Sequence, residues 1–341
     1  MFLSNAIVGH LRDVATWPDL GDGRYTNVRP LGSGGMGRVF AALDEPLGRE
    51  VAIKISHAPV LGSDLDARLR QEARVLAQLE HPGIVPVHDL GLLGDGRVFY
   101  VMKLVRGETL VQRQAPATES AALSVFERVA DAVAFAHARE VIHLDLKPSN
   151  IMVGAFGEVL VMDWGVAKVL APQFPSSASS ASSASSASSA SSASSVSSAS
   201  SPVPQVVGTP GFMAPEQAAG GAVGPASDVY ALGALLFWLL RGVVPPRDLA
   251  SMVSMLKGQP ARVPRRLRAI ITMCLASDPA RRYPDASAVV ADLARYRAGD
   301  AVHALPETPI DRAIRFTAKH ATIILLIAAY LVMRALVAFL R

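Results

Sequence analysis

The sequence predicts an α+β protein with two lobes, a small β-rich N-lobe and a larger helical C-lobe, followed by one C-terminal transmembrane helix. Short β-like runs and glycine-rich turns dominate the chain up to Lys103, with one helical stretch among them. From Glu119 onward, apolar residues recur mainly at helical spacing. A chain of 341 residues, 50% of them hydrophobic, is long enough to bury the cores of two lobes.

Composition limits the compartment in which the chain folds and the partners it can have. Its one cysteine, Cys274, excludes an internal disulfide and favours a reducing compartment. The net charge of +4, from 33 basic and 29 acidic residues, is too small to indicate a nucleic-acid partner. Residues 1–24 lack a basic residue ahead of their short apolar run, so we interpret them as a leader without a secretory signal.

A glycine-rich run, LGSGGMGRV, opens the N-lobe. Gly32, Gly34 and Gly37 have the GxGxxG spacing, which dinucleotide-binding folds share, so the pattern alone is weak. A dinucleotide site would continue into a helix, whereas residues 38–43 continue as a β-like run. The glycines are therefore predicted at the tip of a hairpin, where backbone N–H groups can approach phosphates. A purely structural glycine turn is the alternative.

Lys54 is the one charged side chain inside an apolar strand, VAIKI. A solvated lysine on an edge strand is the usual explanation. The helix predicted next, over residues 64–80, weakens that explanation, because Glu72 lies in the middle of its apolar face. A buried carboxylate needs a fixed cation, and Lys54 is the candidate.

The run HLDLKPSNIMV, followed by VMDWG, brings four polar side chains into two short loops between strand-like segments. They are Asp145, Lys147, Asn150 and Asp163. Their spacing resembles the catalytic and metal-binding loops of the protein kinase family, and the similarity extends over residues 25–297. The phrases DLKPSN and GTPGFMAPE resemble serine/threonine-specific members. The runs GSGGMGRVF and VMDWGVAK look most like bacterial, membrane-anchored members.

The resemblance implies a serine/threonine protein kinase that transfers the γ-phosphoryl group of MgATP to protein hydroxyls, including its own. Asp145 would accept the proton of the substrate hydroxyl, and Lys147 would neutralise the transferring group. Asn150 and Asp163 would hold Mg2+. The residues that the resemblance assigns to nucleotide binding are Leu31, Gly32, Ser33, Gly34, Gly35, Met36, Gly37, Arg38, Val39, Lys54, Glu72, Met102, Lys103 and Val105.

Three of those residues belong to the segment between the lobes, with the N-lobe predicted over 25–105 and the C-lobe over 106–297. By the resemblance, Met102 guards the back of the adenine site, and Lys103 to Val105 form the hinge. Relatives commonly carry Glu in place of Lys103. Because backbone groups read the adenine there, this change is expected to tune nucleotide binding.

Leu144 departs from the family, which usually has Arg before the catalytic Asp. That Arg normally pairs with a phosphorylated activation loop, so this enzyme is expected not to need such a phosphate. A catalytically weak pseudokinase that binds ATP and serves as a scaffold is the alternative. Magnesium-dependent ATP turnover would distinguish an active kinase from a pseudokinase.

The activation segment contains a Ser/Ala-rich insert at residues 172–204, which is interpreted as disordered. Its hydroxyls are candidate autophosphorylation sites, and an inert expansion is the alternative. Beyond it, the resemblance pairs Glu216 with Arg282 and has Asp228 brace the catalytic loop. Residues 242–264 are short for the family, which leaves a helix there in doubt.

The C-terminal part is predicted as a connector over 298–319 and a transmembrane helix over 320–340. About 20 apolar residues can cross a bilayer, and the single Arg334 is near enough to the end to reach the interface. Arg312, Arg315 and Lys319 precede the span and only Arg341 follows it, which predicts a single-pass protein of the inner membrane with a cytoplasmic kinase domain. A last helix docked on the domain or on a partner is the alternative, and homodimerisation through the span stays open.

Overall fold

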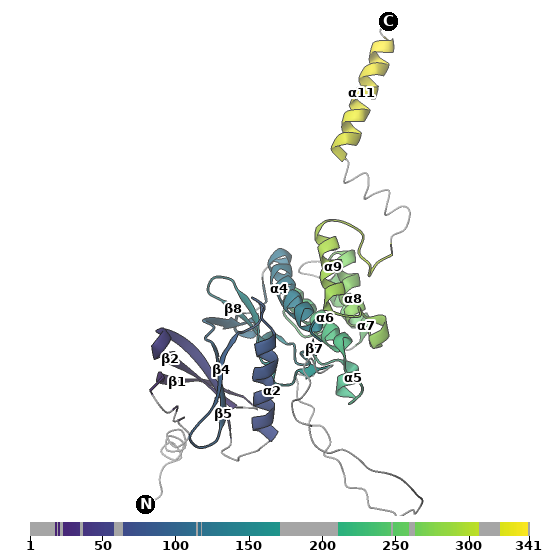
Figure 1. The fold of residues 1–341 in the computed structure, drawn as a ribbon. Coiled ribbons are helices and arrows are strands. Elements are labelled where there is room, and N and C mark those ends of the chain that lie inside the picture. Colours follow the sequence, from purple (N-terminus) through teal and green to yellow (C-terminus); the bar gives the residue numbers. More distant parts are fainter. Residues whose placement is uncertain are drawn as a thin grey trace, which may run out of the picture.

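The computed structural model describes residues 18, 20, 23–34, 37–57, 64–113, 115–116, 118–170, 211–246, 248–258, 263–306 and 321–339. The Ser/Ala-rich insert, most of the leader and most of the connector lie outside these residues, as do Gly35 and Met36. In the described part, a β-sheet lobe and a helical lobe lie side by side, which confirms the two-lobed α+β prediction (Figure 1).

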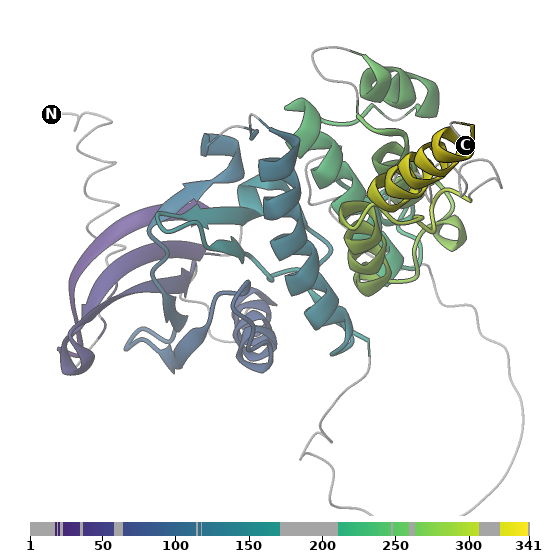
Figure 2. The ribbon, with the colours of Figure 1, turned by 90° about the horizontal axis from the view of Figure 1, so that it is seen from above.

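The N-lobe is an antiparallel five-stranded sheet in the order β1-β2-β3-β5-β4. The strands are β1 (Tyr25–Gly34), β2 (Gly37–Asp44), β3 (Arg49–Ser56), β4 (Val87–Leu92) and β5 (Val98–Lys103), with a one-turn helix at Glu45–Leu47. Val51, Ile53 and Ile55 are fully buried on one face of β3, as their alternation predicts. The helix α2 (Asp64–Gln78) contacts β5, β4 and β3 (Figure 2).

The C-lobe is built on three central helices that pack on one another: α4 (Glu119–His137), α6 (Pro225–Arg241) and α9 (Ala286–Arg297). Around them lie α3 (Leu110–Arg113), α5 (Pro215–Ala218), α7 (Leu249–Lys257), α8 (Arg265–Cys274) and the one-turn helices Pro148–Asn150 and Pro279–Arg281. Two small sheets complete the lobe: β6 (Gly107–Thr109) with β8 (Ile151–Gly154) and β9 (Val159–Val161), and β7 (Val141–Ile142) with β10 (Lys168–Val169). Helix α7 lies in the segment where the sequence left a helix in doubt.

Helices α6 and α8 approach each other at Gly233. A Cβ atom at this position would lie 2.5 Å from the Cβ of Cys274, so only glycine permits this packing distance. Cys274 is fully buried at the contact, and burial raises the pKa of its thiol far above the ordinary value.

The buried carboxylate of Asp292 fastens the start of the connector to α9. It accepts hydrogen bonds from the Tyr283 hydroxyl (2.6 Å) and from the backbone N–H groups of His303 (2.5 Å) and Ala304 (3.0 Å). Burial alone would raise the pKa of Asp292, but these hydrogen bonds outweigh it and hold the pKa below its usual value. The connector therefore begins as part of the folded C-lobe.

This lowered pKa predicts an acid-sensitive contribution to stability. The contribution of Asp292 is present above its unfolded-state pKa of about 3.9 and is lost as the pH falls through the lower folded-state pKa. Asp292→Asn is expected to lower the free energy of unfolding at pH 7 by about 2 kcal/mol, because hydrogen bonds to a charged group are lost. Urea denaturation at pH 7 and at pH 3 checks this, with the exposed Asp131→Asn as control. A difference between wild type and Asp292→Asn that stays constant down to pH 3 contradicts the argument.

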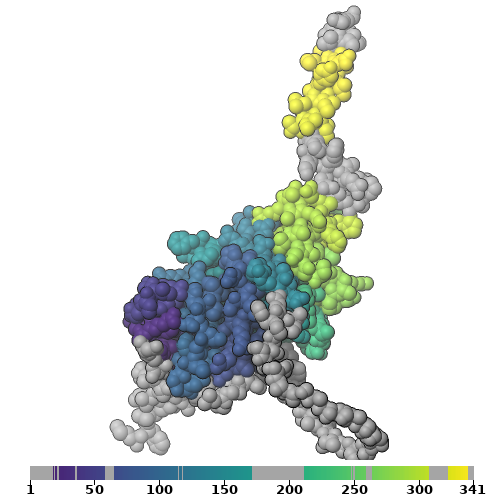
Figure 3. Space-filling model, in the orientation of Figure 1, coloured from purple at the N-terminus to yellow at the C-terminus, as the bar shows by residue number. Residues whose placement is uncertain are grey.

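The last described helix is α11 (Ala321–Phe339), and it stands apart from both lobes (Figure 3). Its apolar side chains between Ile323 and Leu336 are 39 to 70% exposed. Within the described residues, no helix is both long and apolar enough to cross a membrane, so the predicted transmembrane helix at 320–340 is not confirmed.

Candidate active site

Lys54 connects the two lobes through its ammonium group. From β3 it donates to both carboxylate oxygens of Glu72 on α2, at 2.8 Å each, and to Oδ1 of Asp163 in the C-lobe, at 3.2 Å. The Glu72 side chain is fully buried, the Lys54 side chain is 12% exposed and that of Asp163 is 50% exposed. The pair that the apolar face of α2 predicted is thus present, and the exposed member is the predicted metal ligand.

The electrostatics keep Lys54 charged. Burial by itself lowers the pKa of Lys54, but the carboxylates of Glu72 and Asp163 outweigh burial and raise it. Burial likewise raises the pKa of the Asp163 carboxyl, and Lys54 more than reverses this, so the net pKa of Asp163 is below its ordinary value. An ammonium and a carboxylate of opposite charge therefore face each other at neutral pH.

The hydroxyl of Tyr100 on β5 is a further partner of Glu72 that sequence reasoning missed. It donates to Oε1 at 3.0 Å, and Tyr100 is 1% exposed. Tyr100 lies opposite Lys54 in the β3–β5 ladder, a register that the structure shows and the sequence alone does not give. The hydroxyl fixes the orientation of Glu72 independently of Lys54.

Tyr100→Phe is expected to lower the free energy of unfolding by about 1 kcal/mol, because one hydrogen bond to a buried carboxylate is lost. Urea denaturation checks this. The control is Tyr25→Phe, whose hydroxyl bonds to the exposed Asp89 and whose loss should cost less. Equal losses in the two variants contradict a special role for Tyr100.

The loop after β7 holds three of the predicted residues in direct contact. Lys147 Nζ donates to Oδ2 of Asp145 at 2.7 Å. The side-chain amide of Asn150 donates to the same oxygen at 3.0 Å and to the backbone carbonyl of Asp145 at 2.9 Å. The Asp145 carboxylate is 11% exposed and is thereby held in one orientation by a cation and an amide.

The Asp228 side chain holds the backbone of the loop that contains Asp145, as the resemblance implies. Fully buried at the start of α6, it accepts from the backbone N–H groups of His143 (2.7 Å) and Leu144 (2.8 Å). It also contacts Nε2 of the buried His137 at 2.9 Å, while Nδ1 of His137 accepts from the N–H of Ala286. Because Nδ1 is an acceptor, Nε2 carries the proton and donates to Asp228.

A second brace acts on Leu144, whose carbonyl accepts from the side-chain amide of Gln217 at 2.7 Å. Leu144 has φ of 65° and Asp163 has φ of 58°, a left-handed conformation that is uncommon outside glycine. Residues with such backbone conformations occur where surrounding contacts fix the backbone, and they cluster at functional sites. Sequence reasoning did not identify Gln217, which follows the Ala-Pro-Glu motif directly.

Glu216 and Arg282 form a bidentate ion pair with two N–O distances of 2.8 Å. Ser227 donates to the same Glu216 carboxylate at 2.7 Å, and Arg282 also donates to the carbonyls of Ala226, Ala276 and Ser277. The predicted pairing of these two residues is confirmed. It ties the end of the activation segment to the one-turn helix Pro279–Arg281.

The predicted phosphate hairpin has Gly32 and Gly34 in β1 paired with Val39 and Gly37 in β2. A Cβ atom at Gly37 would overlap the carbonyl oxygen of Ile55, so Gly37 is required by packing. At Gly32 and Gly34 a Cβ atom would have no neighbour within 4 Å, so no residue of the described chain requires glycine there.

The remaining nucleotide-binding candidates lie around the same sheet. Leu31 is 46% exposed beside Ser33 on β1, and Arg38 follows Gly37 on β2. On β5, Met102 is buried and Lys103 is exposed, and Val105 follows the strand in a half-buried position.

The residues predicted to hold a metal, Asn150 and Asp163, would do so through side-chain oxygen atoms. Pairing of β8 with β9, and a 2.8 Å hydrogen bond from the Met162 N–H to the Asn150 carbonyl, place these two residues close together. The Asn150 amide nitrogen donates to Asp145, and its oxygen accepts a long hydrogen bond of 3.4 Å from the Ser149 hydroxyl, which a cation could replace. Carboxylate and amide oxygens suit Mg2+, which usually takes further oxygens from water and phosphates. Across the described residues, no cluster of three His, Cys, Asp or Glu side chains forms a metal site.

This fold and this arrangement of loops are those of a protein kinase domain, and the chain belongs to that family, whose domain matches residues 25–292.

Particular bacterial relatives are similar over most of this chain. Serine/threonine-protein kinase PknA of Mycobacterium tuberculosis is 36% identical over 296 residues, which cover 81% of this chain and 62% of PknA. PrkC of Bacillus subtilis is 34% identical, covering 80% of this chain and 40% of PrkC. PknD of Chlamydia caviae is 32% identical, covering 81% of this chain and 31% of PknD. The chain thus spans less than two thirds of the length of these relatives.

Among solved structures, the kinase domain of Mycobacterium tuberculosis PknI matches 82% of this chain and 98% of its own chain. The TM-score is 0.56 and the sequence identity 24%, which establishes the shared fold.

Proposed function

We propose that this protein is a serine/threonine protein kinase that transfers the γ-phosphoryl group of MgATP to protein Ser and Thr hydroxyls. The observation that carries the proposal is the Asp145 carboxylate, held by Lys147 and Asn150 in a loop braced by Asp228. The names of the relatives PknA, PrkC and PknD support the same activity.

Each site residue has one role in this proposal. Asp145 orients the acceptor hydroxyl and takes its proton, while Lys147 neutralises charge on the transferring group. Lys54, held by Glu72, binds the nucleotide phosphates. Asn150 and Asp163 would hold Mg2+, which supplies charge neutralisation at the phosphates when bound. Catalysis then rests on positioning and electrostatic stabilisation.

The glycine hairpin covers the phosphates in this proposal. Gly37 is explained by packing against Ile55, whereas Gly32 and Gly34 border open space. Backbone N–H groups without neighbouring side chains can approach phosphate oxygens closely. Met102, Lys103 and Val105 are proposed to border the adenine, with Leu31 and Val39 on the hairpin side.

We propose that activity does not require a phosphorylated activation loop. Leu144 replaces the Arg that would pair with such a phosphate, and two other groups hold its backbone: Asp228 binds its N–H and Gln217 its carbonyl. The loop is thereby fixed by a buried carboxylate and a side-chain amide, and neither contact involves a phosphate. Phosphatase-treated protein is expected to retain its rate toward an exogenous substrate.

Transfer of labelled γ-phosphate from MgATP by the full chain, into itself and into a generic basic protein, tests the proposed activity. We expect label on Ser and Thr that depends on Mg2+. ATP binding by folded protein without any transfer would overturn the proposal in favour of a pseudokinase scaffold.

Attachment to the inner membrane through residues 320–340, with the domain of residues 25–297 in the cytoplasm, is a separate proposal. Its support is the apolar composition of α11 and the exposure of its described side chains. Membrane fractionation of the full chain tests it, and recovery in the soluble fraction contradicts it. Pairing of two chains through this helix would appear as cross-linked dimers in the same fraction.

A further inference from the structure

A basic hollow with a volume of about 570 Å3 lies on the C-lobe between α7, α8 and the connector. Its lining includes Lys257 from the end of α7, Arg265 and Arg268 from α8, Arg281 and, from the connector, His303. None of its lining residues is Asp or Glu. Four permanent cations therefore surround a space that contains no carboxylate.

These cations are not neutralised elsewhere in the described chain. None of Lys257, Arg265, Arg268 and Arg281 has a carboxylate within ion-pair distance among the described residues. Neighbouring arginines behave differently, since Arg295 pairs with Asp292 and Arg297 with Glu127. The hollow thus brings four cations without an ion pair together in one place.

Arg268 supplies a second, independent observation. Its Nη1 atom is buried and has no hydrogen-bond partner within the described structure. By contrast, Nη1 of Arg266 donates to the carbonyls of Gly299 (2.8 Å) and Asp300 (3.1 Å). A buried guanidinium N–H without an acceptor is unfavourable, and an anion in the hollow would provide the acceptor.

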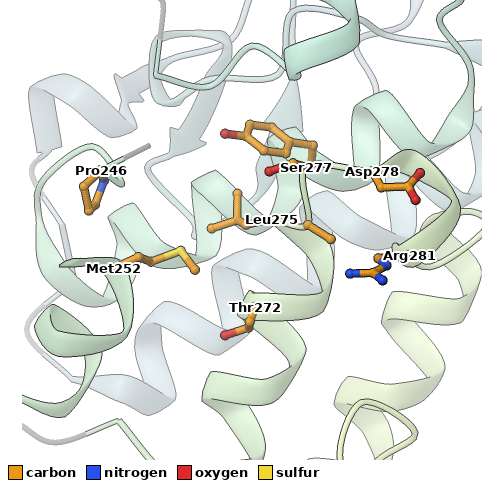
Figure 4. Close-up of a pocket in the computed structure, with 9 residues that line it drawn as sticks. Pro246, Met252, Thr272, Leu275, Ser277, Asp278 and Arg281 are labelled. Atoms are coloured by element: carbon orange, nitrogen blue, oxygen red, sulfur yellow. The ribbon is translucent and has the colours of Figure 1, made fainter. Parts of the chain in front are cut away.

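The adjacent pocket gives a contrast within the same lobe. It shares Thr272 and Arg281 with the hollow, but it is lined otherwise by Tyr230, Pro246, Met252, Leu275, Ala276, Ser277 and Asp278 (Figure 4). It contains one cation and one carboxylate and is mostly apolar. Of these two pockets, only the basic hollow has several cations and no carboxylate in its lining.

We propose that the basic hollow binds the phosphate of an anionic phospholipid headgroup. Phosphate oxygens match the guanidinium donors of Arg268 and its neighbours. The apolar side chains of Val253, Ala269 and Met273 in the same lining suit the glycerol and upper acyl carbons. Clusters of four or more Lys and Arg residues next to a membrane segment are typical of sites that bind anionic lipids.

The position of the hollow favours a lipid over a soluble phosphate. His303, Ala304 and Pro306 line it, and the connector to which they belong leads to α11, whose described apolar side chains are exposed. Asp292 fixes the first part of that connector to α9. This choice of ligand rests on the proposed membrane attachment, whereas it does not depend on the kinase activity.

Co-sedimentation of the full chain with vesicles tests the proposal, comparing pure phosphatidylcholine with a mixture that contains 30% phosphatidylglycerol. Wild type is expected to bind the anionic vesicles more tightly, and the difference should shrink as salt rises. Arg265→Gln with Arg281→Gln, both exposed, should weaken binding to anionic vesicles about 30-fold, at roughly tenfold per 1.4 kcal/mol. Arg268→Gln should weaken it further. The matched control is Arg74→Gln with Arg113→Gln, which removes two exposed charges elsewhere and should leave binding unchanged.

Further measurements distinguish a lipid phosphate from other phosphate-containing ligands. Equal binding of wild type to both kinds of vesicle overturns the proposal, and so does equal weakening by the control pair. Preferential binding of a phosphoserine peptide or of inorganic phosphate, measured with the same variants, also overturns the lipid assignment. Weak binding of every variant to pure phosphatidylcholine would contradict membrane attachment by α11. Phosphoryl transfer, measured in parallel on the same variants, tests the proposed kinase activity separately from lipid binding.

Discussion

Asp145→Asn is expected to reduce phosphoryl transfer by about 100- to 10,000-fold, the contribution of a positioned general base. Asn has nearly the shape of Asp and can still accept from Lys147 and Asn150, so the loop should keep its conformation. The lost group is the carboxylate that is proposed to take the hydroxyl proton. Steady-state kinetics should show the loss in kcat, with the KM for ATP nearly unchanged, because Asp145 is not assigned to the nucleotide.

Asp131→Asn is the matched control for this prediction, since Asp131 is exposed on α4 and has no assigned role in the proposed reaction. Its rate should equal that of wild type. A rate for Asp145→Asn within threefold of the wild-type rate would remove Asp145 from the proposed catalytic role.

Lys54→Met is expected to affect both activity and stability. Loss of the cation that is proposed to hold the phosphates should lower transfer by about 100- to 1,000-fold, as removal of one electrostatic donor does in other enzymes. Glu72 would remain buried without its cation, which costs about 3 to 5 kcal/mol in the free energy of unfolding. Labelled-phosphate transfer and urea denaturation measure the two effects.

A second substitution separates the two effects. In Lys54→Met with Glu72→Gln, the buried charge is gone and Tyr100 still has an oxygen to bond, so most of the lost stability should return. Phosphoryl transfer should not return. Recovery of transfer in the double variant would show that Lys54 acts only by stabilising the fold.

The N-lobe was predictable because its signals are local. Alternation in β3 identified its buried face, and the β-like run after Gly37 distinguished a hairpin from a dinucleotide turn. Glu72 on an apolar helix face predicted a buried cation partner, and the structure pairs it with Lys54. Helix α7 was left in doubt because length comparison with relatives says little about whether a short segment is helical.

Other parts of the site depend on contacts that no sequence period encodes. Tyr100 reaches Glu72 across the space between β5 and α2, and Gln217 reaches Leu144 over 73 positions of the chain. His137 joins Asp228 to Ala286, with its tautomer set by partners on two other elements. Such hydrogen bonds satisfy buried polar groups after the helices have packed, so only the assembled fold reveals them.

The close contact between Gly233 and Cys274 has a practical consequence for experiments on this protein. The chain has one thiol, and that thiol is buried and strongly disfavoured as a thiolate, so it should resist alkylating reagents and mild oxidants while the protein is folded. A cysteine introduced on α11 or at the rim of the basic hollow can therefore carry a spectroscopic label without first removing the native one. Reaction of the unmodified chain with such a reagent would, in turn, report unfolding of the C-lobe.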